Sequence, residues 1–398
     1  MDNDNLDKNN KFIKLIILVL LIILTVSIII LDTFVGKGYL KKAFENISSN
    51  VETSESAIGT ETEDELPQED VSNQQDEEET TQNNSTENIK GEIKFESSSK
   101  SSFRIVDKGF IHCSKDGVKF YNDFEQQKWN STFTMASPIM VGNGTYSAVA
   151  EPSGKIVRVY DNNGEKYNVQ LDGQVSKFFV NENGFLAVIT KINSDYRVRV
   201  FDNTGAEVTK REEKTSGVYP IDVGISSDNR ITAVSYIDTS DVELIAKVVF
   251  FYTFKEDGKE VTDAMFAAIQ KNNEIIGSIK FFGNQLICVS DKNIYGFSFD
   301  GSENWSFKVT NQIDAITFAD DCIIIAYGGV LPNEDGVQEG TVEWISTSGK
   351  CKGTFEFGAK VTYLNGKNEY AVVGSYNEFV GVKSNGSIQW EYKSTADV

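Results

Sequence analysis

Few side chains in this chain could carry out catalysis. Its 398 residues include one histidine, His112, and four cysteines. The adjacent Cys113 would offer a thiol nucleophile beside a base, but neighbouring residues of a strand point to opposite faces. Cys288 and Cys322 lie in apolar runs, where cysteine acts as a small buried hydrophobic residue. We therefore expect no catalytic residue and no enzyme.

Four short segments have the composition of ligand-binding loops without the required spacing. AspAsnAsnGlyGlu (161–165) and GluAspGlyLysGlu (256–260) lack the ligand positions and final glutamate of a calcium loop. GlyAsnGly (142–144) and GlyGly (328–329) lack the strand and helix that flank a phosphate-binding loop. All four are expected to be turns. The sequence thus predicts no metal and no cofactor.

Two acidic insertions are the strongest candidates for a binding site. They separate apolar runs at Tyr236–Glu243 and at Gly328–Gly340. We expect them to bind a basic or cationic partner, because charge complementarity steers association. Solvated loops without a partner are the alternative. The candidate residues are Asp238, Asp241, Glu243, Glu334, Asp335 and Glu339.

Most of the negative net charge comes from one stretch of the chain. The formal charge is −21, which opposes phosphate binding and argues against a nucleic-acid partner. Residues 45–88 hold 14 of the acidic residues and no lysine or arginine. Such a stretch repels itself and buries little apolar surface. We expect a disordered acidic linker, which together with a juxtamembrane segment covers residues 36–102.

An apolar run near the N-terminus predicts a membrane anchor. Residues 15–31 contain no charged side chain, which suits a membrane-spanning helix. A secretory signal peptide is the alternative, but the run continues into AspThrPheVal (32–35) without a small-x-small cleavage site. We expect a single-pass anchor over residues 15–35 behind a short tail of residues 1–14. Three lysines lie on each side, so charge does not set the orientation. Because the acidic linker suits a domain held away from a surface, we place the N-terminus in the cytoplasm.

From residue 103 onward, one pattern recurs. A strand-like run ends in a turn rich in Asp, Asn and Gly, and another run follows, as in ValTyrAspAsnAsnGly (159–164) and ValPheAspAsnThrGly (200–205). The intervals between equivalent turn positions are 39, 41, 53, 43, 48 and 37 residues. A period of about 40–45 residues is typical of propeller blades with four strands each.

The repeat units divide into four strands. In residues 313–355 these include AlaIleThrPhe, CysIleIleIleAlaTyr, ThrValGluTrpIle and GlyThrPheGlu. Trp129, Trp305 and Trp390 occupy the same point of the fourth strand. We expect an all-β propeller of about seven blades within residues 103–398. In such a meander both acidic insertions leave the same face, as second-to-third connections.

These repeats resemble quinoprotein-like and WD40-like propeller repeats. With the anchor and the acidic linker, the chain resembles an uncharacterised group of membrane-anchored Gram-positive β-propellers. That resemblance implies a fold but no activity. The Gly-His and Trp-Asp pairs of WD40 blades do not recur, and the adjacent cysteines of quinoprotein dehydrogenases are absent from the sequence. A quinone cofactor is therefore not implied.

The expected function is binding rather than catalysis. We predict a binding or scaffolding module outside the cell membrane, with a protein or cell-envelope partner. One alternative is a propeller enzyme acting on cell-surface carbohydrate or peptide, which would need convergent carboxylates or a histidine. Another is a sensor ectodomain, although only about 14 residues precede the anchor.

Overall fold

The computed structural model describes residues 101–124, 126–254, 265–328 and 339–393. The tail predicted at residues 1–14, the anchor predicted at residues 15–35 and residues 36–100 of the linker predicted at residues 36–102 lie outside these ranges, and Ser102 already belongs to the first strand. Within them, no helix is long and apolar enough to cross a membrane.

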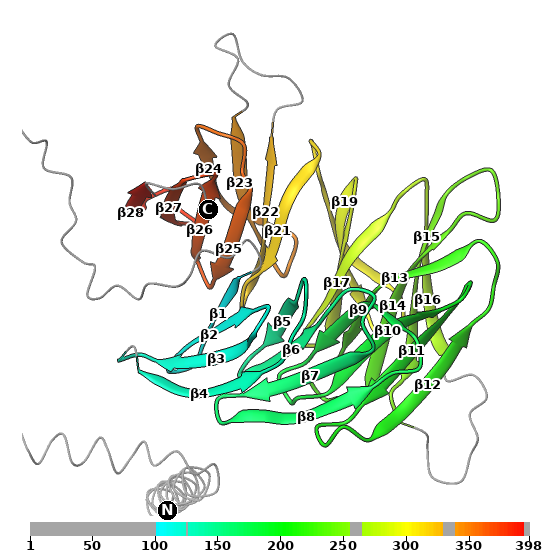
Figure 1. Ribbon diagram of the computed structural model, residues 1–398. Helices are drawn as coiled ribbons and strands as arrows, with labels where there is room; N and C mark the ends of the chain where they lie inside the picture. The colour runs from blue at the N-terminus through cyan, green and yellow to red at the C-terminus, as the bar shows by residue number, and fades with distance from the viewer. Residues whose placement is uncertain (1–100, 125, 255–264, 329–338, 394–398) are drawn as a thin grey trace, which may run out of the picture. The chain divides into compact units, whose positions relative to one another are not determined.

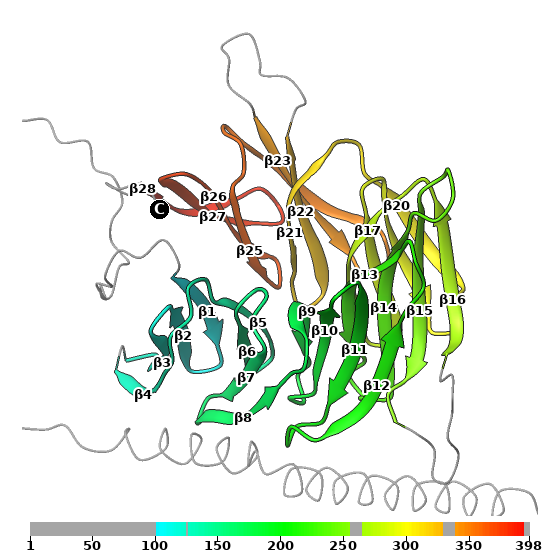
Figure 2. The same ribbon diagram turned by 45° about the vertical axis from the view of Figure 1, so that its right-hand side comes forward.

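The described residues form seven antiparallel sheets of four strands each, so the predicted seven-bladed propeller is confirmed. The sheets follow one another in chain order (Figures 1 and 2). In every sheet the strands pair in sequence order, and we call them A, B, C and D. The first strands contact one another between blades 1 and 2, 2 and 3, 3 and 4, 4 and 5, and 6 and 7.

The strands of blades 1–4 are β1 (Ser102–Val106), β2 (Gly109–Ser114), β3 (Gly117–Asn122), β4 (Gln127–Thr132), β5 (Ile139–Asn143), β6 (Tyr146–Ala150), β7 (Ile156–Asp161), β8 (Gly164–Gln170), β9 (Gln174–Val180), β10 (Leu186–Ile192), β11 (Asp195–Phe201), β12 (Glu207–Glu213), β13 (Val218–Ile225), β14 (Ile231–Asp238), β15 (Ile245–Tyr252) and β16 (Met265–Asn272).

The strands of blades 5–7 are β17 (Ile276–Phe282), β18 (Gln285–Ser290), β19 (Asn293–Ser298), β20 (Glu303–Lys308), β21 (Ile313–Phe318), β22 (Cys322–Gly328), β23 (Gly340–Ser346), β24 (Cys351–Phe357), β25 (Tyr363–Lys367), β26 (Tyr370–Ser375), β27 (Glu378–Lys383) and β28 (Ile388–Lys393).

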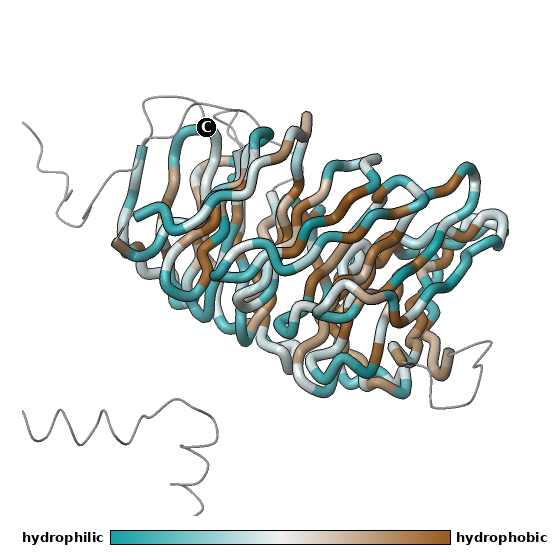
Figure 3. The backbone as a smooth tube through the Cα atoms, turned by 60° about the horizontal axis from the view of Figure 1, so that its bottom comes forward, coloured by the Kyte–Doolittle hydropathy of each residue, from teal (hydrophilic) through white to brown (hydrophobic). Residues whose placement is uncertain are grey.

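The second strand of a blade is buried on both faces. In β22, five consecutive residues from Cys322 to Ala326 are buried, and β10 and β14 show the same pattern. A strand between two packed sheets needs apolar side chains on both faces, so its sequence loses the alternation of a half-exposed strand. Hydrophobic residues accordingly run through the strands, and polar residues gather at many of their ends (Figure 3).

The core consists of clusters that join neighbouring blades. One cluster combines Val157 and Val159 of blade 2 with Phe178 and Leu186 of blade 3. Burying each such side chain stabilises the fold by about 1.5–3 kcal/mol. Each blade therefore depends on its neighbour for the burial of its apolar faces.

The fourth strand of a blade packs on the C–D turn of the next blade. Trp129 of β4 donates from Nε1 to the backbone oxygen of Asn162, at 3.0 Å, and stacks on Tyr160. Trp305 of β20 covers Gly349, where φ is +75° and any Cβ would overlap the indole. Two of the three repeated tryptophans, Trp129 and Trp305, thus form contacts between blades.

The cysteines and the histidine do not form a reactive group. Cys113 is fully buried in the cluster between blades 1 and 2, whereas His112 points to the other face of β2 and stacks on Phe103. Cys288 and Cys322 are also fully buried, and all four cysteines are free thiols. Burial raises the pKa of Cys113 and Cys322 to about 12, which leaves both thiols protonated.

Candidate binding face

The B–C connections and the D–A connections of all blades lie at the same end of the sheets, which we call the B–C face. This follows from the antiparallel order A-B-C-D of every blade. Blades 4 and 5 therefore place loop 239–244 and turn 291–292 on the same face, and the described end of the connection before β23 of blade 6, Glu339, lies there too. Loop 239–244 carries Asp241 and Glu243, two of the acidic residues that the sequence analysis selected.

Asp238 supports its loop instead of pointing into solvent. Strand β14 continues through Asp238, which pairs with Ile245, so the loop begins three residues later than the insertion predicted from Tyr236. The Asp238 carboxylate accepts hydrogen bonds from Lys247 Nζ at 2.5 Å and from the backbone N of Ser240 at 2.9 Å. The side chain is only 8% exposed. These donors lower the pKa of Asp238 to about 2.

The tip of the same loop is open to solvent. Asp241 and Glu243 are exposed on both sides of Val242, which is 99% exposed. The Asp241 carboxylate accepts one hydrogen bond, from the backbone N of Val242 at 2.7 Å. Both carboxylates are therefore placed where a partner can reach them.

The second acidic insertion is described only at its end. Glu339 is exposed and lies directly before β23. Glu334 and Asp335 lie outside the described residues. Of the six candidate residues, the structure thus places Asp241, Glu243 and Glu339 at exposed positions of the B–C face and Asp238 in a supporting one.

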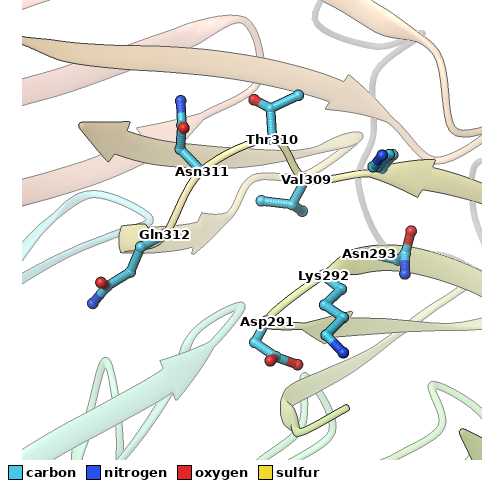
Figure 4. A pocket seen from close by; sticks show the side chains of 8 residues that line it. Asp291, Lys292, Asn293, Val309, Thr310, Asn311 and Gln312 are labelled. Carbon is cyan, nitrogen blue, oxygen red and sulfur yellow. The ribbon is translucent and has the colours of Figure 1, made fainter. Parts of the chain in front are cut away.

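A shallow pocket lies on blade 5, between the two acidic loops in blade order. Its volume is about 400 Å³. One wall is the B–C turn Asp291–Asn293, and the other is Lys308 with the D–A connection that follows it, Val309–Gln312 (Figure 4). Lys292 donates from Nζ to the backbone oxygen of Asn273, which ties this wall to the connection before β17. The sequence analysis missed this pocket because its two polar segments carry no motif.

Glu274 holds the turn that forms the pocket wall. Its half-buried carboxylate accepts hydrogen bonds from Tyr295 Oη at 2.8 Å, Ser290 Oγ at 2.7 Å and Asn293 Nδ2 at 3.2 Å. Burial, together with the Glu274 carboxylate, raises the pKa of Tyr295, so its hydroxyl stays a donor. This network makes the wall a rigid element.

A second group of charged residues lies at the opposite end, near the A strands. Arg104 of β1 donates to Ser147 Oγ at 3.0 Å and to the backbone oxygen of Gly144 at 2.7 Å. Burial lowers its pKa to about 10. Lys280 of β17 lies over the rings of Phe282 and Phe318, and burial is the main cause of its lowered pKa. No sequence motif marks these residues, because they come from strands far apart in the chain.

The chain matches the family of unknown function DUF5711 over residues 80–398. It belongs to that family. No curated protein matches the chain. The family match covers the whole described propeller and confirms the expected resemblance to uncharacterised propeller proteins.

Several solved structures are similar in fold. BamB from Moraxella catarrhalis shares 15% identity at a TM-score of 0.43, over 74% of this chain and 88% of that chain. Hsv2 from Kluyveromyces lactis shares 11% identity at a TM-score of 0.46, over 74% of this chain and 96% of that chain. At these values the likeness says nothing about what members of the DUF5711 family bind.

The described residues contain no group of three or more His, Cys, Asp or Glu side chains that could hold a metal ion. The charges of Asp320, Glu182 and Arg104 act on Lys280. This group mixes both signs of charge. The tip of loop 239–244 exposes the two carboxylates of Asp241 and Glu243 on the B–C face, so it is the stronger candidate for a charged partner.

Proposed function

We propose that this chain is a membrane-anchored binding module whose propeller lies outside the cell. The propeller binds a basic protein segment on the B–C face of blades 4–6. The observation that carries this proposal is the exposed loop tip with Asp241 and Glu243, on the same face as the pocket of blade 5. Loops on a stable scaffold are where proteins place their binding residues.

The charge on this face supports a basic partner. Asp238 is already neutralised by Lys247, whereas Asp241 and Glu243 are exposed and form no ion pair among the described residues. Exposed carboxylates of this kind increase the rate of encounter with a cationic segment. Val242 adds an exposed apolar contact at the same tip. A lysine- or arginine-rich peptide with one apolar side chain would match these features.

The anchor and the orientation rest on the sequence alone. The apolar run at residues 15–31 supports a single membrane span, and the acidic stretch at residues 45–88 supports a spacer between membrane and propeller.

One experiment tests location and partner together. Intact cells that carry the full chain with a C-terminal tag are treated with protease, and untreated cells are crosslinked so that the tagged protein can be recovered. We expect the protease to remove the tag and the crosslinked material to contain basic envelope proteins. A tag that survives protease on intact cells contradicts the extracellular placement.

A matched pair of triple variants tests the binding face. The first carries Asp241→Asn, Glu243→Gln and Glu339→Gln, and Asp238 is kept because it supports the loop. The control carries Asp107→Asn, Asp123→Asn and Glu369→Gln, which remove three charges from the A–B and C–D turns at the opposite end. We expect partner recovery to fall only in the first variant. Equal recovery from both variants contradicts this site.

A further inference from the structure

The end of the propeller opposite to the B–C face carries two half-buried cations without an ion pair. Arg104 of β1 donates to Ser147 Oγ and to the backbone oxygen of Gly144, and both of these acceptors are uncharged. Lys280 of β17 lies over two phenylalanine rings. Neither cation forms a salt bridge within the described part of the chain. Because removing a charge from water is costly, a buried cation usually has an anionic partner.

The turn between β5 and β6 holds Arg104 together with a carboxylate. Gly144 in this turn accepts a hydrogen bond from Arg104 Nη2 at 2.7 Å, and the preceding Asn143 donates from Nδ2 to Glu182 Oε2 at 2.9 Å. Gly142 of β5 leaves room for the guanidinium, since a Cβ at this position would overlap Arg104 Nε. A cation of blade 1 and a carboxylate of blade 3 are therefore fixed on one turn of blade 2.

Blades 5 and 6 hold the second cation and a second carboxylate. Lys280 Nζ lies 5.2 Å from the ring centre of Phe282 and 5.7 Å from that of Phe318. Both rings are half-buried, and the turn that follows Phe318 carries the exposed Asp320. Burial lowers the pKa of Lys280, and the charge of Asp320 acts in the opposite direction. Lys280 is thus held on two rings with a carboxylate nearby that does not form an ion pair with it.

The two pairs of charges lie at the same end of the propeller, on A strands and A–B turns. Besides Asp320, the charges of Glu182 and Arg104 also act on Lys280. Since charges are screened over about 10 Å in dilute salt, groups that influence one another lie close together. We call Arg104, Lys280, Glu182 and Asp320 the four-charge cluster. Its members are half-buried or exposed, so a small solute can reach them.

We propose that the four-charge cluster binds a free α-amino acid in its zwitterionic form. The two cations bind the carboxylate, because guanidinium and ammonium groups form strong hydrogen bonds with it. The two carboxylates bind the ammonium group of the amino acid. The partly exposed rings of Phe282 and Phe318 contact its side chain. The two carboxylates of the cluster repel a purely anionic ligand, and its two cations repel a purely cationic one.

Binding of amino acids to the full chain in a mild detergent tests this proposal. A thermal-shift assay with each of the common amino acids selects the ligand, since a ligand that binds only the folded chain raises its unfolding midpoint. Calorimetric titration then compares this amino acid with its amide and with its N-acetyl form. Each derivative lacks one of the two charges, so each should bind about tenfold more weakly or worse.

Two results of this comparison overturn the proposal. If no amino acid raises the midpoint, the four-charge cluster is not an amino-acid site. If the amide or the N-acetyl form binds as tightly as the free amino acid, the cluster does not recognise a zwitterion. The cluster lies at the end opposite to the B–C face, so neither result depends on the basic partner proposed for that face.

Lys280→Met separates binding from folding. This substitution removes a half-buried charge that has no ion pair, so the free energy of unfolding should be unchanged or higher. The affinity for the selected amino acid should fall about tenfold or more, and Lys280→Arg, which keeps the charge, should restore part of it. The matched control is Lys210→Met at an exposed position of β12, which should bind as the unchanged chain does. Equal affinities of Lys280→Met and Lys210→Met contradict a site at Lys280.

Discussion

Asp238 is a candidate binding residue in the sequence, but in the structure its carboxylate supports the fold. It lies in a run with Asp241 and Glu243, yet only Asp238 is held by Lys247 and Ser240 at the end of a strand. Sequence spacing does not distinguish these three residues, because the difference arises from the cross-strand position of Lys247.

At the residue scale we predict that Asp238→Asn lowers the free energy of unfolding by about 2 kcal/mol at pH 7, since charge-assisted hydrogen bonds are lost. The folded pKa of Asp238 is lowered to about 2, below its unfolded value of about 4. Its contribution is therefore complete above pH 4 and disappears as the pH falls toward 2. Urea denaturation at pH 7 and at pH 2 measures the effect.

The paired control for this substitution is Glu243→Gln in the same loop. Glu243 is exposed, so the free energy of unfolding of the Glu243→Gln variant should match that of the unchanged chain at both pH values. If Asp238→Asn is equally stable at pH 7, or if its deficit is as large at pH 2, the assigned role of the carboxylate is wrong.

At the scale of elements, the A–B turns of neighbouring blades are joined by buried side chains. Asn181 is fully buried between blades 3 and 4. Its Nδ2 donates to the Ser226 backbone oxygen at 3.2 Å and to Asn229 Oδ1 at 2.6 Å, and its Oδ1 accepts from the Phe185 backbone N at 3.0 Å. One amide thus fixes two turns that are far apart in sequence.

We predict that Asn181→Ala lowers the free energy of unfolding by about 3 kcal/mol, because buried donors and acceptors lose their partners. The denaturation midpoint should fall with little change of slope. Asn163→Ala, an exposed position in the C–D turn of blade 2, is the control and should change stability by less than about 0.5 kcal/mol. Similar midpoints for both variants would contradict a joint between the blades.

At the scale of the whole molecule, the contacts divide the chain into residues 1–85 and residues 86–398. The family match begins near the same place, at residue 80. The acidic stretch of residues 45–88 has little apolar surface to bury against a propeller.

We therefore predict that a chain starting at residue 86 and a chain starting at residue 45 unfold at the same temperature. The acidic stretch adds charge but no core, so calorimetry should give one transition with the same midpoint for both. A lower midpoint for the shorter chain would mean that the acidic stretch stabilises the propeller.

A further prediction concerns the salt dependence of the proposed binding. From about 0.1 M to 1 M salt the Debye length shortens from about 10 Å to about 3 Å, so exposed charges interact more weakly. Recovery of the partner should decline over this range, because Asp241 and Glu243 are exposed. Recovery that is constant from 0.1 M to 1 M, measured by pull-down with the unchanged chain, would exclude a charge-based contact.

The sequence by itself determined the propeller, because each blade repeats the same local pattern. Continuous apolar runs such as Cys322–Ala326 identify strands packed on both faces, and glycines such as Gly349 mark turns that need a positive φ. The equivalent positions of Trp129, Trp305 and Trp390 also follow from the repeat. Local patterns of this kind depend on residues close in the chain, so no tertiary structure is needed to find them.

Only the tertiary structure decided what each charged side chain does. Asp238 became a structural residue because Lys247 lies nine residues away on the paired strand, and the pocket formed where two polar segments of blade 5 meet. Arg104 and Lys280 approach each other from strands that are far apart in the chain. Burial and charge depend on distances between such segments, and the spacing of residues along a sequence does not contain those distances.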